Sequence, residues 1–385
     1  MALQNDHPIT TSERQLVFPS TCEALQSKPR LRILEDAALN AEALPRWLDE
    51  NTRTPILSFF VRNNGQLPHV SPDQNDAWTL AIDGEVEQSR TWDLRGLKRD
   101  FETVSIEAVL ECAGNGRVGF VPRTPGLQWR NGAVGCALWR GVRLRDVLIA
   151  SRVRDSAVYT GHYSPDVQIG SSDKPSLSRG LPIAKAMAPE TLLAFEMNDE
   201  PLPFLHGGPL RVVAPGFAGS AWQKWITRIW VRDCVHDGEK MGGTHYRLPR
   251  PQISPGEPID TSEFDIITEM PVKSLITFPE ENFSLRSGDR LLVRGFAWSG
   301  RAPISSVSVS TDNGKTWHPA ELDRCTDKFA WRRFRLAIES PVEGPVVLAA
   351  CASDQESNTQ PLDPTPWNPG GYCNNQVHRI CGFIK

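Results

Sequence analysis

The sequence predicts an α+β protein in which a mixed α/β domain is followed by an immunoglobulin-like β-sandwich. The 385 residues exceed what one hydrophobic core usually serves. Helical and strand-like apolar patterns alternate between residues 50 and 250. Short strand-like runs separated by turn residues follow. We therefore expect an N-terminal extension over residues 1–50, a mixed domain over 51–255 and a sandwich over 265–385.

The early part of the mixed domain carries strand patterns that end in polar or glycine-rich loops. Residues 55–60 (PILSFF) predict a strand that delivers the polar loop 61–65, and residues 78–86 predict a hairpin. A short helix should begin at Leu94. The β-branched run 104–111 predicts a strand that leads directly into a loop beginning with Cys112. Such a loop is a common way to present a side chain at a site.

Later segments predict helices over 139–150 and 182–187, and strands over 192–197 and 210–213. Prolines cluster between residues 249 and 258, which indicates an extended connector. We place the junction of the two domains near residues 249–270. Beyond it, strand-like runs at 291–298, 304–310, 331–338 and 345–352 are separated by turn signals, as in immunoglobulin-type sandwiches.

Charge and hydropathy exclude several classes of protein. A net charge of −4 and a pI near 6.1 give no global basic field for nucleic acid. No apolar run approaches a membrane span, and residues 1–11 lack the basic start and apolar core of a signal peptide. We expect a cytoplasmic protein, or a periplasmic one if a signal peptide lies outside this numbering.

The eight cysteines are scattered, with no C-x-x-C pair. Zinc sites, c-type haem and disulfide scaffolds therefore lose support, and most cysteines should be reduced, buried core residues. Cys112 is the exception worth testing, because a thiolate is a soft ligand for transition metals and the following glycines let a bulky cofactor approach the backbone.

Two further groups of residues suggest anion binding. His206, Arg211 and Lys224 lie within twenty positions between predicted strands, a set that suits a phosphate. The alternative is that the first two only cap strand ends at the surface. A second group could hold a small oxyanion, although each member alone could be a solvated arginine or a core tyrosine. Its members are Arg62, Arg117 and Tyr246.

Taken together, these segments resemble the sulfite oxidase family, which includes the molybdenum part of plant-type nitrate reductases. The resemblance runs over residues 50–385 and rests on the order of its motifs. They are FFVRNN at 59–64, LECAGNGR at 110–117, GLQWRNGAV at 126–134, LLAFEMNDEPLP at 192–203, HGGPLRVVAPG at 206–216 and QKW at 223–225, then FAWSG, DNGKTW and WNPGG in the second domain.

The resemblance implies a molybdenum-molybdopterin cofactor whose metal takes Cys112 as its protein ligand. His206, Arg211 and Lys224 would hold the phosphate and pterin, helped by Asn63, Asn64 and Gln223. Arg62, Arg117, Tyr246 and Trp129 would form the substrate pocket, and residues 271–385 would form a symmetric homodimer.

The expected activity is oxidation of sulfite to sulfate with an external electron acceptor such as a cytochrome, because the sequence has no C-x-x-C-H haem motif. The family has an arginine at the position of Gly116 and another, from the sandwich domain, near Gly370. A family lysine is missing near Pro125, and Asn64 stands where animal and plant enzymes have histidine. A sulfane-sulfur dehydrogenase or another oxyanion oxidoreductase is therefore the alternative enzyme. A non-enzymatic binding or assembly protein is the alternative of a different class.

Overall fold

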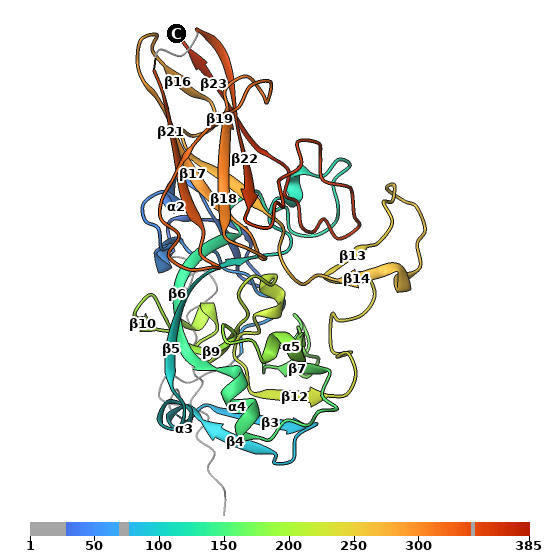
Figure 1. Cartoon of the computed structure of the whole chain (residues 1–385). Helices are drawn as coiled ribbons and strands as arrows, with labels where there is room; N and C mark the ends of the chain where they lie inside the picture. The colour runs from blue at the N-terminus through green and yellow to red at the C-terminus, as the bar shows by residue number, and fades with distance from the viewer. Residues whose placement is uncertain (1–27, 69–76, 340–342) are drawn as a thin grey trace, which may run out of the picture.

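The computed structural model describes residues 28–68, 77–339 and 343–385. Residues 1–27, which hold most of the expected N-terminal extension and Cys22, lie outside the described part. Residues 28–50 form β1 (Leu31–Glu35), β2 (Asn40–Ala43) and α2 (Pro45–Leu48). In Figure 1 this segment lies near the junction between an upper β-rich body and a lower mixed body.

The lower body contains two sheets in the described part of the chain. One has the order β10 (Glu200–Pro201), β9 (Leu192–Met197), β6 (Val134–Arg143) and β5 (Thr103–Glu111), with β11 (Arg211–Val213) paired to β9. The other has the order β4 (Arg90–Asp93), β3 (Thr79–Gly84), β12 (Arg228–Arg232), β7 (Tyr159–Tyr163) and β8 (Gly180–Pro182). Short helices lie beside them: α3 (Leu94–Asp100), α4 (Leu144–Ala150) and α5 (Ile183–Ala186).

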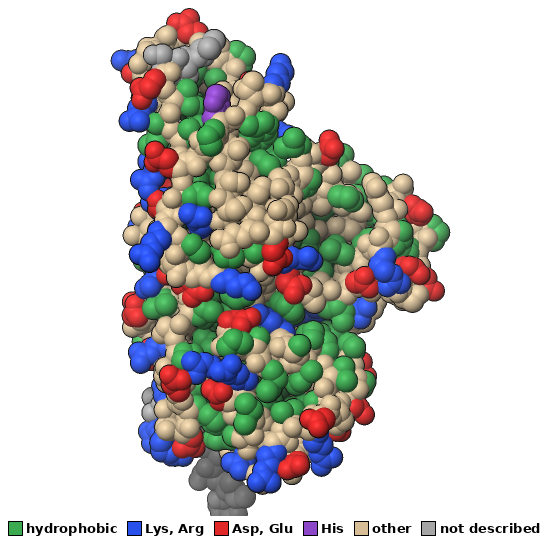
Figure 2. All heavy atoms as spheres, in the orientation of Figure 1, with side chains coloured by type: hydrophobic (Ala, Val, Ile, Leu, Met, Phe, Trp, Pro, Cys, Tyr) green, Lys and Arg blue, Asp and Glu red, His purple; other side chains and the backbone are tan. Residues whose placement is uncertain are grey.

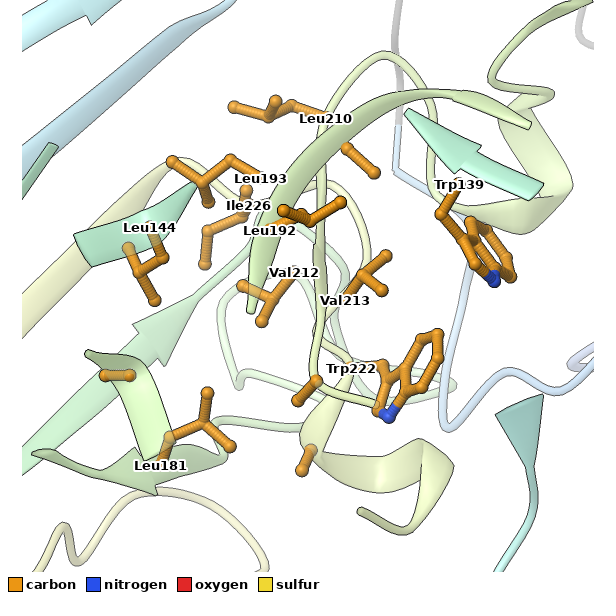
Figure 3. Packing of buried hydrophobic residues seen from close by; sticks show 14 of the residues in the cluster. Trp139, Leu144, Leu181, Leu192, Leu193, Leu210, Val212, Val213, Trp222 and Ile226 are labelled. Atoms are coloured by element: carbon orange, nitrogen blue, oxygen red, sulfur yellow. The ribbon is translucent and has the colours of Figure 1, made fainter. Parts of the chain in front are cut away.

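The core of this body forms where β6, β9 and β11 bring apolar side chains together (Figure 3). The indole rings of Trp139 and Trp222 meet edge to face, with centroids 5.6 Å apart. Such pairs add about 0.5–1.5 kcal/mol beyond the burial of their area. The packed strands thus fix the loops that leave their ends.

The upper body is a sandwich of two mainly antiparallel sheets (Figure 1). Its strands are β15 (Lys273–Phe278), β17 (Leu291–Trp298), β21 (Arg332–Ile338) and β20 (Glu321–Leu322) in one sheet, and β16 (Phe283–Leu285), β23 (His378–Ile384), β22 (Gly344–Asp354), β18 (Ile304–Ser310) and β19 (His318–Pro319) in the other. The hairpin of β13 (Arg247–Pro249) and β14 (Phe264–Ile266) projects from the junction.

The predicted fold class is confirmed, while three local predictions are wrong. Residues 78–86 do not close a hairpin by themselves, because Thr79–Gly84 is one strand, β3, whose antiparallel partner β4 begins at Arg90. Residues 55–60 do not form a strand, because Ile56–Ser58 is a 3-10 turn. The helix expected over 139–150 begins only at Leu144, since residues 139–143 continue β6 and pair with strands on both sides. At residues 139–143, pairing with a strand on each side overrides the local helical pattern.

Burial of the cysteines also differs from expectation. The seven cysteines in the described residues are free, but only Cys112, Cys136 and Cys373 are buried, whereas Cys234 and Cys381 are exposed.

On the face drawn in Figure 2, acidic and basic side chains are interspersed. Within the described residues, no helix is long and apolar enough to span a bilayer.

Candidate active site

Cys112 follows the last residue of β5 and is 7% exposed. The loop that carries it is fixed from both domains. Asn115 donates its backbone N–H to the Cys112 carbonyl, and its side-chain amide donates to Glu111. Lys273, from β15 of the sandwich, donates to the Glu111 carboxylate at 3.2 Å and to the Asn115 carbonyl at 3.0 Å. The Cys112 thiol therefore has a rigid support.

Two cavities meet at Cys112. The inner cavity is lined by the cationic group predicted from the sequence, His206, Arg211 and Lys224, together with Gln223 and several aromatic rings. The outer pocket is lined by Arg117, Trp129 and Tyr372. The residues that line both are Arg62, Asn63, Asn64, Cys112 and Tyr246. A ligand bound in the inner cavity can therefore contact a second molecule in the outer pocket, beside the Cys112 thiol.

The inner cavity gathers several basic side chains, and Asp166 is the one carboxylate among its described lining residues. Burial lowers the pKa of Arg211 to about 9. Burial also lowers the pKa values of His206 and Lys224 well below their usual values. The guanidinium of Arg211 is held by the carbonyls of His206 and Trp222, at 2.6 and 2.9 Å. A single carboxylate cannot neutralise both the buried guanidinium of Arg211 and the ammonium of Lys224, so an anionic ligand would stabilise this arrangement.

Asn63 and Gln223 are oriented by hydrogen bonds at the wall of the same cavity. The Asn63 amide donates to the carbonyls of Ala38 and Leu39 and accepts from the Lys224 ammonium. Gln223 donates to the hydroxyl of Ser164 at 2.6 Å. These contacts leave the side chains little freedom before any ligand binds.

Arg62, Asn64 and Tyr246 form a connected group between the two cavities. The side-chain oxygen of Asn64 accepts from Arg62 Nη2 at 2.9 Å and from the Tyr246 hydroxyl at 3.0 Å. Lys240 Nζ lies 3.2 Å from the same oxygen. Asn64 thus orients Arg62 and Tyr246, two residues predicted to bind an oxyanion, although the sequence analysis assigned Asn64 to the cofactor.

Arg117 completes the outer pocket from the Cys112 loop. Its Nε donates to the Gly370 carbonyl at 3.0 Å, and its Nη1 donates to the Leu127 carbonyl at 2.9 Å. Its guanidinium carbon lies 5.3 Å from the ring centroid of Tyr372. Buried Trp129 forms part of the pocket wall, as expected.

Four residues of the site were missed by sequence reasoning: Lys28, Asp166, Lys240 and Tyr372. Asp166 is a buried carboxylate on the inner cavity that accepts a hydrogen bond from Ser164 at 2.5 Å. None of the four stands in a segment with a distinctive pattern, so the sequence alone gave no signal for them.

The chain matches two family models, one for an oxidoreductase molybdopterin binding domain over residues 64–240 and one for a Mo-co oxidoreductase dimerisation domain over residues 264–382. Sulfite oxidase of Gallus gallus is 32% identical over 361 residues, which cover 91% of this chain and 77% of that protein. Mitochondrial sulfite oxidase of Rattus norvegicus is 36% identical over 371 residues, which cover 91% of this chain. The chain belongs to the sulfite oxidase family.

This chain spans 65% of the length of the rat sulfite oxidase that it matches. Its fold is also that of the solved sulfane dehydrogenase SoxCD from Paracoccus pantotrophus, with a TM-score of 0.76 and 24% identity over 98% of this chain and 93% of the other. It is a molybdopterin-dependent oxidoreductase with a dimerisation domain.

The residues of this sulfite oxidase family member fit a molybdenum-molybdopterin cofactor. The inner cavity combines buried basic side chains with aromatic walls, which suits an anionic phosphate attached to a heterocycle. Cys112 lies on the side of the cavity nearest the outer pocket and offers the soft ligand that molybdenum accepts.

Proposed function

We propose that this enzyme oxidises sulfite to sulfate and passes the electrons to an external acceptor such as a cytochrome. The observation that carries the proposal is the place of Cys112, which lines both a cation-lined cofactor cavity and a pocket with two guanidinium groups and two phenols. The named sulfite oxidases at 32–36% identity support the same substrate.

The reaction adds one oxygen atom from water to sulfite and releases two electrons and two protons. When bound, the molybdenum cofactor supplies the oxygen transfer and accepts both electrons. The protein must then bind the substrate, orient it and hold charge near the metal. In this assignment Cys112 ligates the metal, and no side chain has to act as a strong base.

Arg62 and Arg117, which both line the outer pocket, are proposed to stabilise the substrate anion. Each guanidinium is already anchored by oxygen acceptors, Arg62 by Asn64 and Arg117 by Gly370 and Leu127. Their positions are therefore set before the substrate enters, which lowers the entropy cost of binding. Tyr246 would donate a hydrogen bond to a substrate oxygen by turning its hydroxyl away from Asn64.

A symmetric homodimer through the sandwich domain is proposed from the match to a dimerisation domain. Light scattering at increasing protein concentration tests it, because a monomer at high concentration would contradict the proposal.

A larger sulfur compound, such as one with a sulfane sulfur, is the second candidate substrate. Two features of the outer pocket favour it. The pocket has a volume of about 510 Å³ and opens to solvent, so it has more room than a small oxyanion needs. Gly370 contributes only its backbone to this pocket, and phenol rings take much of the adjacent wall.

The test combines metal analysis with an assay coupled to a dye or cytochrome, using sulfite, thiosulfate and nitrate as substrates. We expect about one molybdenum per chain, as one cofactor domain implies, and the highest kcat/KM for sulfite. Replacing Cys112 with Ser should abolish turnover at saturating sulfite while the pterin stays bound, because a hydroxyl is a poor soft ligand.

Cys136→Ser is the matched control, since Cys136 is also a buried free cysteine but lies in the core away from both cavities. It should lose stability but keep activity. Full activity of Cys112→Ser would refute the assignment of the metal ligand, and a chain without molybdenum would favour the non-enzymatic alternative.

A further inference from the structure

Lys28 lies behind His206, a residue of the cofactor cavity wall. It belongs to a segment that precedes the part of the chain matched by the molybdopterin binding domain. Its side chain is 5% exposed, and it has no carboxylate within ion-pair distance among the described residues. Its ammonium nitrogen lies 2.7 Å from the Ile56 carbonyl oxygen, 3.2 Å from the Phe59 carbonyl oxygen and 2.6 Å from Nε2 of His206.

The three contacts account for every donor of a lysine ammonium group, which has three N–H bonds and no lone pair. The two carbonyl oxygens can only accept hydrogen bonds. When Lys28 is charged, Nε2 of His206 must also accept, so the imidazole proton is on Nδ1.

The ring of His206 has a fixed orientation. It is 2% exposed and meets the Phe59 ring edge to face, with centroids 5.3 Å apart. His206 also lines the cofactor cavity, and in the described part of the chain no partner occupies its Nδ1. The proton on Nδ1 is therefore available to a ligand.

We propose that Lys28 is a positioning residue of the cofactor site: it fixes the Nδ1–H tautomer of His206, so that this imidazole donates a hydrogen bond to the anionic phosphate of the pterin. Lys28 acts through His206 and does not itself line the cavity.

The charges around this pair agree with the assignment. Burial, the largest cause, and then the cations Lys28, Lys224 and Arg211 lower the pKa of His206, so its imidazole is neutral and has one proton to place. Burial also lowers the pKa of Lys28 to about 7. A bound phosphate opposes that shift by attraction, so the holoenzyme favours the ammonium form that the tautomer requires.

The first test measures cofactor retention without any substrate, which keeps it independent of the proposed sulfite oxidation. Lys28→Met should retain roughly tenfold less molybdenum and pterin per chain after dialysis than the wild type, by analogy with the loss of other supporting hydrogen bonds behind a ligand. Lys28→Gln keeps an N–H donor and should lose less. Lys315→Met, a change at an exposed lysine of the sandwich, should retain the cofactor fully.

The second test reads the tautomer directly by nitrogen NMR of the holoenzyme with isotope-labelled histidine, with His206→Gln identifying the signals. We expect a protonated Nδ1 and a bare Nε2 in the wild type. A protonated Nε2 in the wild-type holoenzyme would overturn the proposal, even if Lys28→Met failed to fold. So would full cofactor retention by a folded Lys28→Met protein.

Discussion

The phenol rings of Tyr246 and Tyr372 are stacked, with centroids 5.4 Å apart and planes inclined by 19°. The guanidinium of Arg179 lies 5.1 Å from the Tyr246 centroid, and that of Arg117 lies 5.3 Å from the Tyr372 centroid. Tyr372 belongs to the second domain, so the sandwich completes a pocket built mainly by the first. Burial, the largest cause, and neighbouring Tyr246 raise the pKa of Tyr372 to about 12, so its phenol is neutral at physiological pH.

Replacing Tyr372 with Ala should weaken the pocket, because it removes the stacking partner of Tyr246 and the aromatic face beside Arg117. Stacking and cation–π contacts of this kind contribute about 1–2 kcal/mol in total. We expect a higher KM for sulfite and a lower denaturation midpoint. Tyr372→Phe keeps both rings and should stay near wild type. If both variants changed equally in KM and denaturation midpoint, the hydroxyl group rather than the ring would be responsible for the effect.

Position 370 has no room for a side chain, because the ring of Tyr372 fills the space beside it. A Cβ atom on Gly370 would lie 2.2 Å from Cε2 of Tyr372. Gly370→Ala should therefore cost about 1–3 kcal/mol through overpacking. The double variant with Tyr372→Ala should recover part of that loss, and urea unfolding measures both. Strict additivity of the two changes would contradict the steric explanation.

Lys273 and Glu111 form a buried ion pair that joins the sandwich to the Cys112 loop, with side chains 5% and 2% exposed. Lys273→Met would leave the Glu111 carboxylate without its cation. We expect a loss of about 3–5 kcal/mol in the free energy of unfolding. Adding Glu111→Gln removes the stranded charge while keeping an acceptor for Trp298, so the double variant should be more stable than Lys273→Met alone. A double variant that is less stable than both single variants would exclude this account.

The sequence predicted the parts of the site that stand in patterned segments. Strand 104–111 ends at Cys112 as expected, and pairing of β9 with β11 brings Arg211 to the cavity that also receives His206 and Lys224. The structure places these residues together, while their roles remain predictions. Residues outside such patterns could not be located in this way.

Lys28 and Tyr372 illustrate what a single sequence leaves out. Each is an ordinary residue in a segment without periodicity, and each reaches the site only through long-range packing, Lys28 against His206 and Tyr372 against Tyr246. The 3-10 turn at 56–58 was not predicted for a related reason, because a short apolar run carries no period that separates a strand from a turn.

The stability of the apoprotein should depend on pH through Lys28. Its pKa is lowered from 10.5 to about 7 by burial, so between these values the unfolded chain binds more protons than the folded one. Stability therefore rises with pH across this window. At pH below 7 the group is protonated in both states and the slope from it vanishes.

Urea unfolding of apoprotein at pH 7 and pH 9, with Lys28→Met as the reference, isolates this contribution. The difference between the two proteins should change by up to about 3 kcal/mol in favour of the wild type, since each pKa unit corresponds to about 1.4 kcal/mol. In the holoenzyme the cofactor phosphate raises the pKa of Lys28, so the change should be smaller. A pH-independent difference in the apoprotein would show that Lys28 titrates normally.

Asn64 offers the sharpest test of the oxyanion pocket, because its side-chain oxygen holds both Arg62 and Tyr246. Asn64→Asp keeps the shape and the acceptor but adds a negative charge beside the substrate. A charge-assisted contact of about 1.5–3 kcal/mol corresponds to roughly ten- to a hundredfold in kcat/KM. Arg62→Gln should lower kcat/KM by that factor, mainly by raising KM.

Asn64→Asp should raise the KM for sulfite by a similar factor while changing kcat less, and Asn313→Asp in an exposed turn of the sandwich should change neither. Arg62→Gln combined with Asn64→Asp should cost less than the sum of the two, because both act on the same guanidinium. Steady-state kinetics with sulfite decides the matter. If Asn64→Asp kept the wild-type KM, the anion would have to bind elsewhere, and the roles of Arg62 and Tyr246 would fall together.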